Sequence, residues 1–429
     1  MRWVLHVVYD LAWLAAALVG LPWLLWRAGR TRGFATMVLE RLGRGLAAIP
    51  PARVDRPRIL VHGVSVGEIK GSASIVRALQ ETWPGVEVVV CTTTNTGLAV
   101  ARELFAGHHV VRFPADVSLV LRRFLRRVQP AFVVLIELEI WPNFLRECNR
   151  CRIPVVVANG RITDWSHSRY LFFRRLMPQF NRISLFCVQS ETYAERFRLL
   201  GVDPRRIVVT GTPKADGLRI GRADPGEELR RLLGGREGQL VLVAGSTHEP
   251  EELLLARAWR RAVPALRLVL VPRHPERARS VARELAKEGC APRRLSALRA
   301  GEERPDPAAP VLVDTIGELE RVYGLADLVF VGGSLVPHGG HNMLEPAAQG
   351  RPVLFGPHNA NFVHESRILL AAGAALEVAD EAELGASLAA LAADPARREA
   401  MSRAGLETVA RQKGATAKAV QALAELLGA

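Results

Sequence analysis

The chain has 429 residues, which is long for one hydrophobic core, so two domains of roughly 170 to 200 residues are expected. Hydrophobic residues make up 49% and charged residues 23%, which excludes an intrinsically disordered chain. The net charge of +14 favours partners that carry phosphate, and charge alone allows both nucleic acid and anionic membranes. Only five cysteines are present, which argues against a secreted disulfide scaffold.

The chain begins with a nearly continuous apolar segment at 3–26, WVLHVVYDLAWLAAALVGLPWLLW. About 20 such residues can cross a bilayer as a helix. More arginines follow the segment than precede it, which places its far end in the cytosol. His6 and Asp10 interrupt the apolar run, so a monotopic helix at the interface remains an alternative to a single-pass anchor. A buried core helix is the third interpretation.

Short apolar runs then alternate with helical patterns along the rest of the chain. The predicted strands are 59–62, 87–91, 110–113, 131–136, 155–158, 185–189 and 207–210, followed by 240–244, 266–271, 311–313, 328–331 and 352–355. Strands that alternate with helices predict an α/β protein with parallel, doubly wound sheets.

A change of pattern divides the chain. Glycines and charged residues replace the alternation between 211 and 239, and a strong apolar strand begins at 240. We therefore predict an N-terminal membrane anchor and two Rossmann-like domains joined by a linker. Their predicted bounds are 1–30 for the anchor, 31–215 for the N-terminal domain, 216–239 for the linker and 240–429 for the C-terminal domain.

A glycine-rich stretch at 332–362, GGSLVPHGGHNMLEPAAQGRPVLFGPHNANF, follows a predicted strand. Its two glycine pairs are expected to leave backbone amides open to a ligand. Asn342 is predicted to cap a helix over 343–349, whose free N–H groups favour a phosphate, and Glu345 is suited to ribose hydroxyls. The stretch is typical of half a nucleotide site, and an ordinary strand-to-helix connection is the alternative.

Three acidic residues and one arginine follow predicted strands. Glu68 comes at the start of a helix and is a candidate base, or else only a partner of the helix dipole. Glu137 and Glu139 would face the same side if their strand continued, and such a pair could bind a metal or hold a base and a cation, with a structural salt bridge as the alternative. Arg273 follows the strand at 266–271, where it could bind a phosphate.

A run of arginines at helical spacing is either a solvated face or a site for lipid phosphates. Its members are Arg122, Arg123, Arg126 and Arg127, and Arg174 and Arg175 would extend it.

Several of these stretches resemble, in order, the motifs of the bacterial Kdo transferases, which move 3-deoxy-D-manno-oct-2-ulosonic acid (Kdo) from CMP-Kdo onto lipid A precursors. Besides the glycine-rich stretch they are HGVSVGE at 62–68, IELEIWPN at 136–143, NGR at 159–161, GTPKAD at 211–216, STHE at 246–249 and VPRHPER at 271–277. The resemblance covers nearly the whole chain. It departs from the family at Met343 and Gly160, neither of which removes a charged group.

The resemblance implies a GT-B glycosyltransferase fold, in which two Rossmann-like domains face a cleft and the last helix returns to the first domain. The N-terminal domain would bind the acceptor and the C-terminal domain the CMP-sugar. The implied activity is inverting transfer of Kdo to the lipid A precursor lipid IVA, in lipopolysaccharide core biosynthesis. The catalytic domains would lie on the cytoplasmic side of the inner membrane, with its anionic lipids as partners and without nucleic acid.

The resemblance also assigns roles. Glu68 would be the general base, and Glu137 would act with Lys214 in the transition state. The residues implied in CMP binding are Pro272, Arg273, Ile316, Gly317, Glu318, Asn342, Met343, Leu344 and Glu345. No Asp-x-Asp motif is present, so no metal and no cofactor besides the donor is expected.

Two other classes of function remain open at this point. One is a nucleotide-sugar epimerase or hydrolase on the same architecture, and the other is a non-catalytic protein that binds nucleotides or lipid phosphates. The number of Kdo units transferred has no motif that the sequence reveals.

Overall fold

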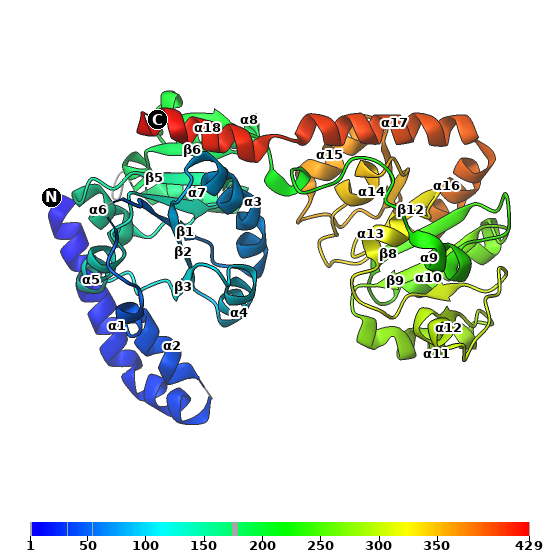
Figure 1. Cartoon of the computed structure of the whole chain (residues 1–429), viewed down its shortest axis with the longest axis horizontal. Helices are drawn as coiled ribbons and strands as arrows, with labels where there is room; N and C mark the ends of the chain where they lie inside the picture. The colour runs from blue at the N-terminus through cyan, green and yellow to red at the C-terminus, as the bar shows by residue number, and fades with distance from the viewer. Residues whose placement is uncertain (1, 32, 54, 174–178, 429) are drawn as a thin grey trace. The chain divides into compact units, whose positions relative to one another are not determined.

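A computed structural model describes residues 2–31, 33–53, 55–173 and 179–428, so Arg174 and Arg175 lie outside the described residues. The chain divides into two compact units, Met1–Gly217 with Lys413–Ala429, and Leu218–Gln412. Each unit is built on a seven-stranded parallel sheet, which confirms the prediction of parallel sheets (Figure 1).

The strands of the N-terminal unit are β1 (Arg58–His62), β2 (Glu87–Thr92), β3 (His109–Arg112), β4 (Phe132–Ile136), β5 (Val155–Gly160), β6 (Leu185–Val188) and β7 (Ile207–Val209). They lie in the order β3-β2-β1-β4-β5-β6-β7. Successive side chains of β1 enter two different cores, Leu60 on one face and Ile59 and Val61 on the other. Helices therefore cover both faces of the sheet.

The helices of this unit are α1 (Arg2–Arg30), α2 (Phe34–Arg41), α3 (Val66–Thr82), α4 (Asn95–Leu104), α5 (Ser118–Val128), α6 (Pro142–Arg150), α7 (Asp164–Phe173), α8 (Glu191–Leu199) and α18 (Ala415–Leu427), with the short 3₁₀ turns η1 (Leu46–Ala48), η2 (Gln179–Arg182), η3 (Pro204–Arg206) and η4 (Pro213–Ala215). On α5, Arg122 pairs with the buried Glu147 at 3.1 Å, and Arg127 donates to the Leu46 carbonyl at 3.2 Å. These two members of the arginine run bond within the unit.

The last helix, α18, belongs to the N-terminal unit although it ends the chain. The Asp216 carboxylate accepts from the backbone N–H groups of Gly414 at 2.7 Å and Thr416 at 2.6 Å, at the start of the helix. These contacts satisfy N–H groups that a helix start leaves without a partner. Val420 and Leu423 then enter the core beside β1 and β4.

The strands of the second unit are β8 (Val241–Thr247), β9 (Arg267–Pro272), β10 (Arg293–Arg294), β11 (Val311–Leu312), β12 (Leu328–Val331), β13 (Val353–Phe355) and β14 (Ala375–Glu377). Their order is β10-β11-β9-β8-β12-β13-β14. The outer strands β10 and β14 were not predicted. They have two and three residues, too few for an apolar run.

The helices of the second unit are α9 (Gly226–Leu233), α10 (Glu251–Ala262), α11 (Ala278–Lys287), α12 (Leu295–Ala300), α13 (Leu319–Tyr323), α14 (Leu344–Ala348), α15 (Val363–Ala371), α16 (Glu381–Ala393) and α17 (Pro395–Gln412), with one 3₁₀ turn, η5 (Pro275–Arg277). The structure differs from the prediction of a linker at 216–239, because α9 lies within it. Leu229, Leu232 and Leu233 give α9 a buried apolar face, and the charged residues between them hid that face in the sequence.

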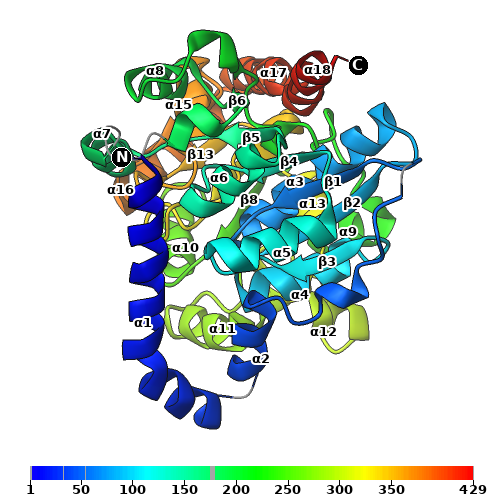
Figure 2. The same ribbon diagram turned by 90° about the vertical axis from the view of Figure 1, so that its left-hand side faces the viewer.

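Helix α1 contains a segment, Leu5–Arg30, that is long and apolar enough to cross a membrane. None of the residues 11–30 is buried, so the interpretation of α1 as a core helix is wrong. Figure 2 shows α1 as a long rod, with α2 beside its carboxyl-terminal end. An apolar helix that the protein does not cover is typical of a segment in contact with lipid.

Candidate functional site

The N-terminal unit carries a group of carboxylates after the carboxyl ends of β1 and β4. Ser65 and Glu68 form a capping box at the start of α3, in which the Ser65 Oγ accepts the Glu68 N–H at 3.2 Å. The Glu68 carboxylate accepts from the N–H of Val64 at 2.8 Å and from the Ser65 hydroxyl at 2.7 Å. These contacts hold the carboxylate in one orientation just beyond the end of β1.

β4 does not continue through Glu137, so the condition under which Glu137 and Glu139 would face the same side is not met. The strand ends at Ile136, and Glu137 has a φ of +63°, a left-handed conformation that turns the chain. Its carboxylate accepts from Arg161 Nε at 2.8 Å, an ion pair supplied by the NGR motif. Burial raises the pKa of Glu137, and the charge of Arg161 opposes that rise.

The sequence indicated Glu139 only as the partner acid of Glu137. Its carboxylate accepts from the Trp141 indole N–H at 3.2 Å. Burial, and then the negative charge of Glu68, raise the pKa of Glu139 to about 7. The ammonium of Lys214 on η4 lowers the pKa of Glu137, so these four charged residues form one electrostatic group.

Carboxylates gathered beside a cation are typical of sites that transfer protons and stabilise charge. The structure thus brings together Glu68, Glu137 and Lys214, as the sequence predicted. It adds Arg161, which the sequence signalled only as a member of the NGR motif, and it places Glu139, noted as the partner acid of Glu137, in the same group.

The second unit has a cavity of about 350 Å³ at the carboxyl ends of its strands, where parallel α/β sheets bind ligands. Five of the predicted CMP-binding residues line it, namely Pro272, Arg273, Ile316, Gly317 and Glu318. They come from the end of β9 and from the loop after β11.

The remaining predicted CMP-binding residues lie at the start of α14, which is shorter than the predicted helix at 343–349. The Asn342 side chain accepts the Leu344 N–H at 3.3 Å and donates to Glu345 at 3.1 Å. Burial raises the pKa of Glu345, and the positive charge of Arg273 opposes that rise. Glu345 therefore lies within the electrostatic field of Arg273, which lines the cavity. The side chains of Met343 and Leu344 are buried, so any contact they make with a ligand would come from backbone atoms.

The glycine pairs do not leave their amides open, and in this respect the sequence prediction is wrong for Gly332, Gly333 and Gly340. The N–H groups of Gly332 and Gly340 donate to backbone carbonyls, at 2.9 and 2.7 Å. The buried Glu251 carboxylate accepts from Gly333 at 2.7 Å and from Ser334 and Leu335 at 3.0 Å each. A fourth bond comes from the His248 N–H at 2.8 Å.

Glu251 therefore fixes the loop from inside. The loop also needs glycine at 332, because a Cβ there would lie 2.6 Å from the Ser246 carbonyl oxygen. Burial raises the pKa of Glu251, and the four backbone N–H groups oppose that rise. In the sequence, Glu251 is simply an acid in the first turn of a helix.

Replacing Glu251 with Gln is expected to destabilise the protein by about 3 kcal/mol or more, because the amide would turn an N–H₂ group toward N–H donors. The measurement is the urea unfolding midpoint at constant m-value. Glu249→Gln is the matched control, since that side chain is 69% exposed. A midpoint for Glu251→Gln that matches the control would contradict this role.

Histidines lie together beside the glycine loop. The Nε2 atoms of His248 and His341 are 2.8 Å apart, and the His338 ring stacks on His248 at 4.2 Å. Burial lowers the pKa of both His248 and His341 to about 4, so these two rings are neutral at pH 7. No role was predicted for this group, whose members come from two motifs far apart in the chain, His248 from one and His338 and His341 from the other.

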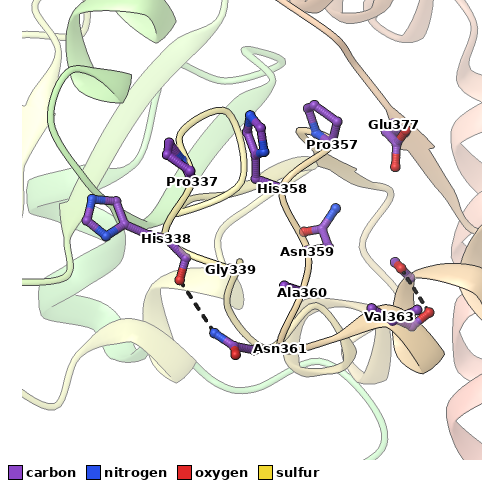
Figure 3. Close-up of a pocket in the computed structure, with 11 residues that line it drawn as sticks. Pro337, His338, Gly339, Pro357, His358, Asn359, Ala360, Asn361, Val363 and Glu377 are labelled. Carbon is purple, nitrogen blue, oxygen red and sulfur yellow. Dashed lines mark hydrogen bonds between the residues drawn. The ribbon is translucent and has the colours of Figure 1, made fainter. Parts of the chain in front are cut away.

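A second cavity in the same unit, of about 600 Å³, is lined by the loops that follow β12 and β13 (Figure 3). Asn361 donates to the His338 carbonyl at 3.4 Å and joins the two loops. This cavity shares none of its lining residues with the cavity at Arg273.

Comparison with known proteins identifies the family. The model of the 3-deoxy-D-manno-octulosonic-acid transferase (kdotransferase) family matches residues 37–217. The 3-deoxy-D-manno-octulosonic acid transferase of Haemophilus influenzae is 34% identical over 402 residues, which cover 90% of each chain. The chain belongs to the 3-deoxy-D-manno-octulosonic acid transferase family. The Bordetella pertussis transferase is also 34% identical, over 98% of this chain and 99% of its own.

Membership of this family makes the chain a glycosyltransferase. The fold agrees, since a solved glycosyltransferase from Rickettsia africae superposes with a TM-score of 0.60 at 13% identity, covering 87% of this chain and 99% of that one. This confirms the predicted GT-B fold.

Proposed function

We propose that this Kdo transferase moves Kdo from CMP-Kdo to the lipid A precursor lipid IVA, in lipopolysaccharide core biosynthesis. The observation that carries the proposal is the 34% identity to named Kdo transferases over nearly the whole chain. It favours transfer over the epimerase, hydrolase and binding-protein alternatives. The grouping of Glu68, Glu137 and Lys214 supports it, because a protein that only binds nucleotides has no use for such a group.

In the proposed reaction, the Glu68 carboxylate takes the proton from the acceptor hydroxyl as its oxygen attacks the anomeric carbon of Kdo. The bond from the anomeric carbon to the CMP phosphate breaks, and the phosphate leaves with the electron pair. The configuration of the anomeric carbon inverts because the acceptor oxygen attacks from the face opposite the phosphate. Glu68 suits this role because its turn fixes the carboxylate at the end of β1. Lys214 and the Glu137–Arg161 pair would stabilise charge in the transition state.

The second unit would hold the donor. Arg273 is suited to the CMP phosphate, since a guanidinium binds phosphate through two parallel hydrogen bonds. Glu345 is suited to accept from the ribose hydroxyls, and backbone groups at 316–318 to contact the nucleotide. Asn342, Met343 and Leu344 would complete the site, the last two through backbone atoms.

We further propose that the enzyme is attached by α1 to the inner membrane, with the catalytic units on the cytoplasmic side. The exposed apolar surface of α1 and the arginines at its end support this location. Anionic lipids of that membrane would be its partners, and no nucleic acid is involved.

Incubation with labelled CMP-Kdo and tetraacyl lipid A precursor tests the function. The expected product is lipid that carries the label, together with free CMP. Release of CMP and free Kdo without labelled lipid would indicate a hydrolase, and binding without turnover would indicate a non-catalytic protein.

Transfer is expected to continue at full rate in excess EDTA, because Arg273 and Lys214 would supply the positive charge that a metal supplies in other glycosyltransferases. The measurement is initial rate before and after chelation. Loss of activity that added magnesium or manganese restores would contradict the proposal of metal independence.

A further inference from the structure

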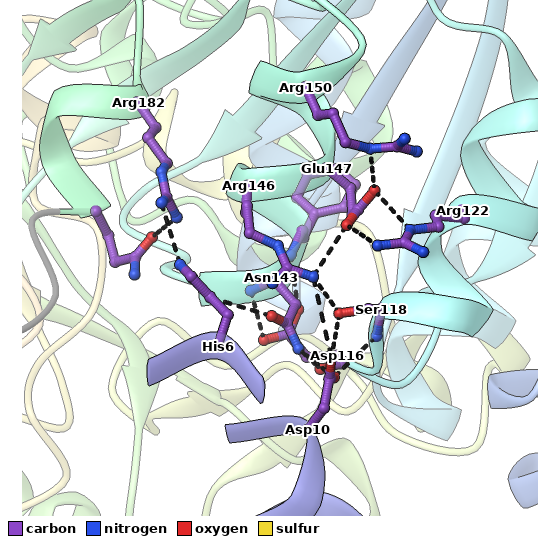
Figure 4. Close-up of polar contacts among 12 residues, drawn as sticks. His6, Asp10, Asp116, Ser118, Arg122, Asn143, Arg146, Glu147, Arg150 and Arg182 are labelled. Atoms are coloured by element: carbon purple, nitrogen blue, oxygen red, sulfur yellow. Dashed lines mark hydrogen bonds and ion pairs between the residues drawn. The ribbon is translucent and has the colours of Figure 1, made fainter. Parts of the chain in front are cut away.

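The first turns of α1 are bonded to the globular part of the N-terminal unit. The Asp10 carboxylate accepts from the Ser118 N–H at 3.1 Å and from the Asn143 side chain at 2.7 Å, and it also accepts from the Ser118 hydroxyl (Figure 4). His6 is buried and contacts Asn143 at 3.2 Å and Arg182 at 3.1 Å. The two residues that interrupt the apolar run therefore fasten α1 to the unit.

The surroundings of this attachment are strongly charged. Glu147 accepts hydrogen bonds from Arg122, Arg146 and Arg150 within the same group of contacts (Figure 4). Charged groups of this density are costly in hydrocarbon. The amino-terminal turns of α1 must therefore lie in water or among lipid headgroups.

The chain returns to the same unit soon after α1 ends. Glu40 of α2 pairs with the buried Arg112 of β3 at 2.8 Å, and the Arg41 carbonyl accepts the Ala115 N–H at 2.8 Å. Both ends of the segment 11–39 are thus fastened to one folded unit.

Chain length then limits how far α1 can reach. Residues 31–33 cover about 10 Å at full extension. The eight residues of α2 add about 12 Å. Arg30 therefore lies within about 22 Å of Arg41, which is less than the hydrocarbon core of about 30 Å. A helix whose far end must stay this close to the unit cannot emerge on the opposite side of a bilayer.

The surface between the two attachments is apolar, and arginines lie at the carboxyl-terminal end of α1. Leu18 and Val19 are 63% and 84% exposed, and further exposed apolar residues are Leu11, Leu14, Leu21, Trp23, Leu25, Trp26 and Leu39. The Arg27 guanidinium lies over the Trp23 and Phe34 rings, and that of Arg30 over Trp26. Tryptophan beside arginine is typical of the membrane interface, where cations meet anionic headgroups.

We propose that α1 and α2 form a re-entrant element that enters one leaflet of an anionic bilayer and leaves it on the side from which it entered. The enzyme would then be a monotopic membrane protein, with the amino terminus of α1, residue 30 and the folded unit on one side. This inference rests on the proposed membrane attachment and concerns only its topology.

Cysteine accessibility in native membranes tests the topology. Gly29 is exposed, and a Cβ there meets no atom within 4 Å, so Gly29→Cys places a label site past the apolar run without a clash. Cys151 is the exposed native cysteine and reports the side of the folded unit, while the other four are buried. Gly29→Cys is therefore made with Cys151→Ser, and the full-length wild-type chain serves as reference.

A membrane-impermeant maleimide is applied to spheroplasts and to inverted membrane vesicles. Both cysteines are expected to react in the same preparation, and the extent of labelling of each is expected to differ at least tenfold between the two preparations. Reaction of Gly29→Cys in the preparation where Cys151 is protected, or its protection in both, would overturn the proposal. So would recovery of the protein from the soluble fraction as a dimer, since a second copy would then cover α1. Transfer to detergent-dispersed acceptor, measured on the same variants, reports the proposed function separately.

Discussion

Replacing Glu68 with Gln is expected to lower the turnover of CMP-Kdo at saturating donor by about a hundred- to ten-thousand-fold, or about 3 to 5 kcal/mol of barrier. Gln has nearly the shape of Glu and also closes a capping box, so α3 should still begin at Val66. It cannot take a proton from the acceptor. CMP affinity should be unchanged, because the residues proposed to bind CMP all belong to the second unit.

Glu139→Gln is the matched variant for this experiment. Glu139 belongs to the same electrostatic group, and its pKa of about 7 makes it the strongest rival as a base. Glu137, a third carboxylate of the group, is paired with Arg161 and is less suited to accept a proton. If Glu68→Gln keeps near wild-type turnover while Glu139→Gln loses it, the base is Glu139.

A pH profile separates the two assignments further. A base with the pKa of Glu139 becomes protonated as the pH falls through about 7, so kcat/KM would drop tenfold for each pH unit below that value. Glu139→Gln would remove that limb of the profile if Glu139 were the base. Persistence of the same limb in Glu139→Gln would exclude it.

The fold followed from the sequence wherever a strand is buried on both faces. β12 is a continuous apolar run, and β1 has one at 59–61 between Arg58 and His62, because a parallel strand under helices on both sides buries the side chains of both its faces. β10 consists of two arginines at the edge of its sheet, and only its pairing with β11 makes it a strand. Such pairing depends on neighbours that local sequence does not specify.

Candidate site residues could be named from the sequence where they stand in one short motif. Arg273 directly follows β9, and Glu68 follows β1 after a short turn; the carboxyl end of a parallel strand is where an α/β fold places ligand-binding groups. Glu251 was missed because the loop that it holds lies 82 positions later, at Gly333. The contact between His248 and His341 likewise joins residues 93 positions apart. The order of the motifs supports the family resemblance, but only the fold shows which of these residues are in contact.

Replacing Glu345 with Ala is expected to weaken CMP binding by about 10- to 100-fold, the opposite profile to that of Glu68→Gln. The carboxylate is buried at the start of α14, within the field of Arg273, and is proposed to accept from the ribose hydroxyls. Hydrogen bonds to a charged group contribute about 1.5 to 3 kcal/mol each, and Ala provides no acceptor. Turnover at saturating donor should stay near the wild-type value, because the base is intact.

Titration calorimetry with CMP on three variants tests this prediction. Glu345→Gln keeps an oxygen that can accept from Asn342, as Glu345 does at 3.1 Å, and therefore isolates the effect of the charge. Glu320→Ala is the matched control, since Glu320 is exposed and also acts on the Glu345 pKa. The expected order of Kd is wild type equal to Glu320→Ala, then Glu345→Gln, then Glu345→Ala. A Kd for Glu345→Ala within twofold of the control would show that the ribose is held elsewhere, and the backbone at 316–318 would then be the principal contact to the nucleotide.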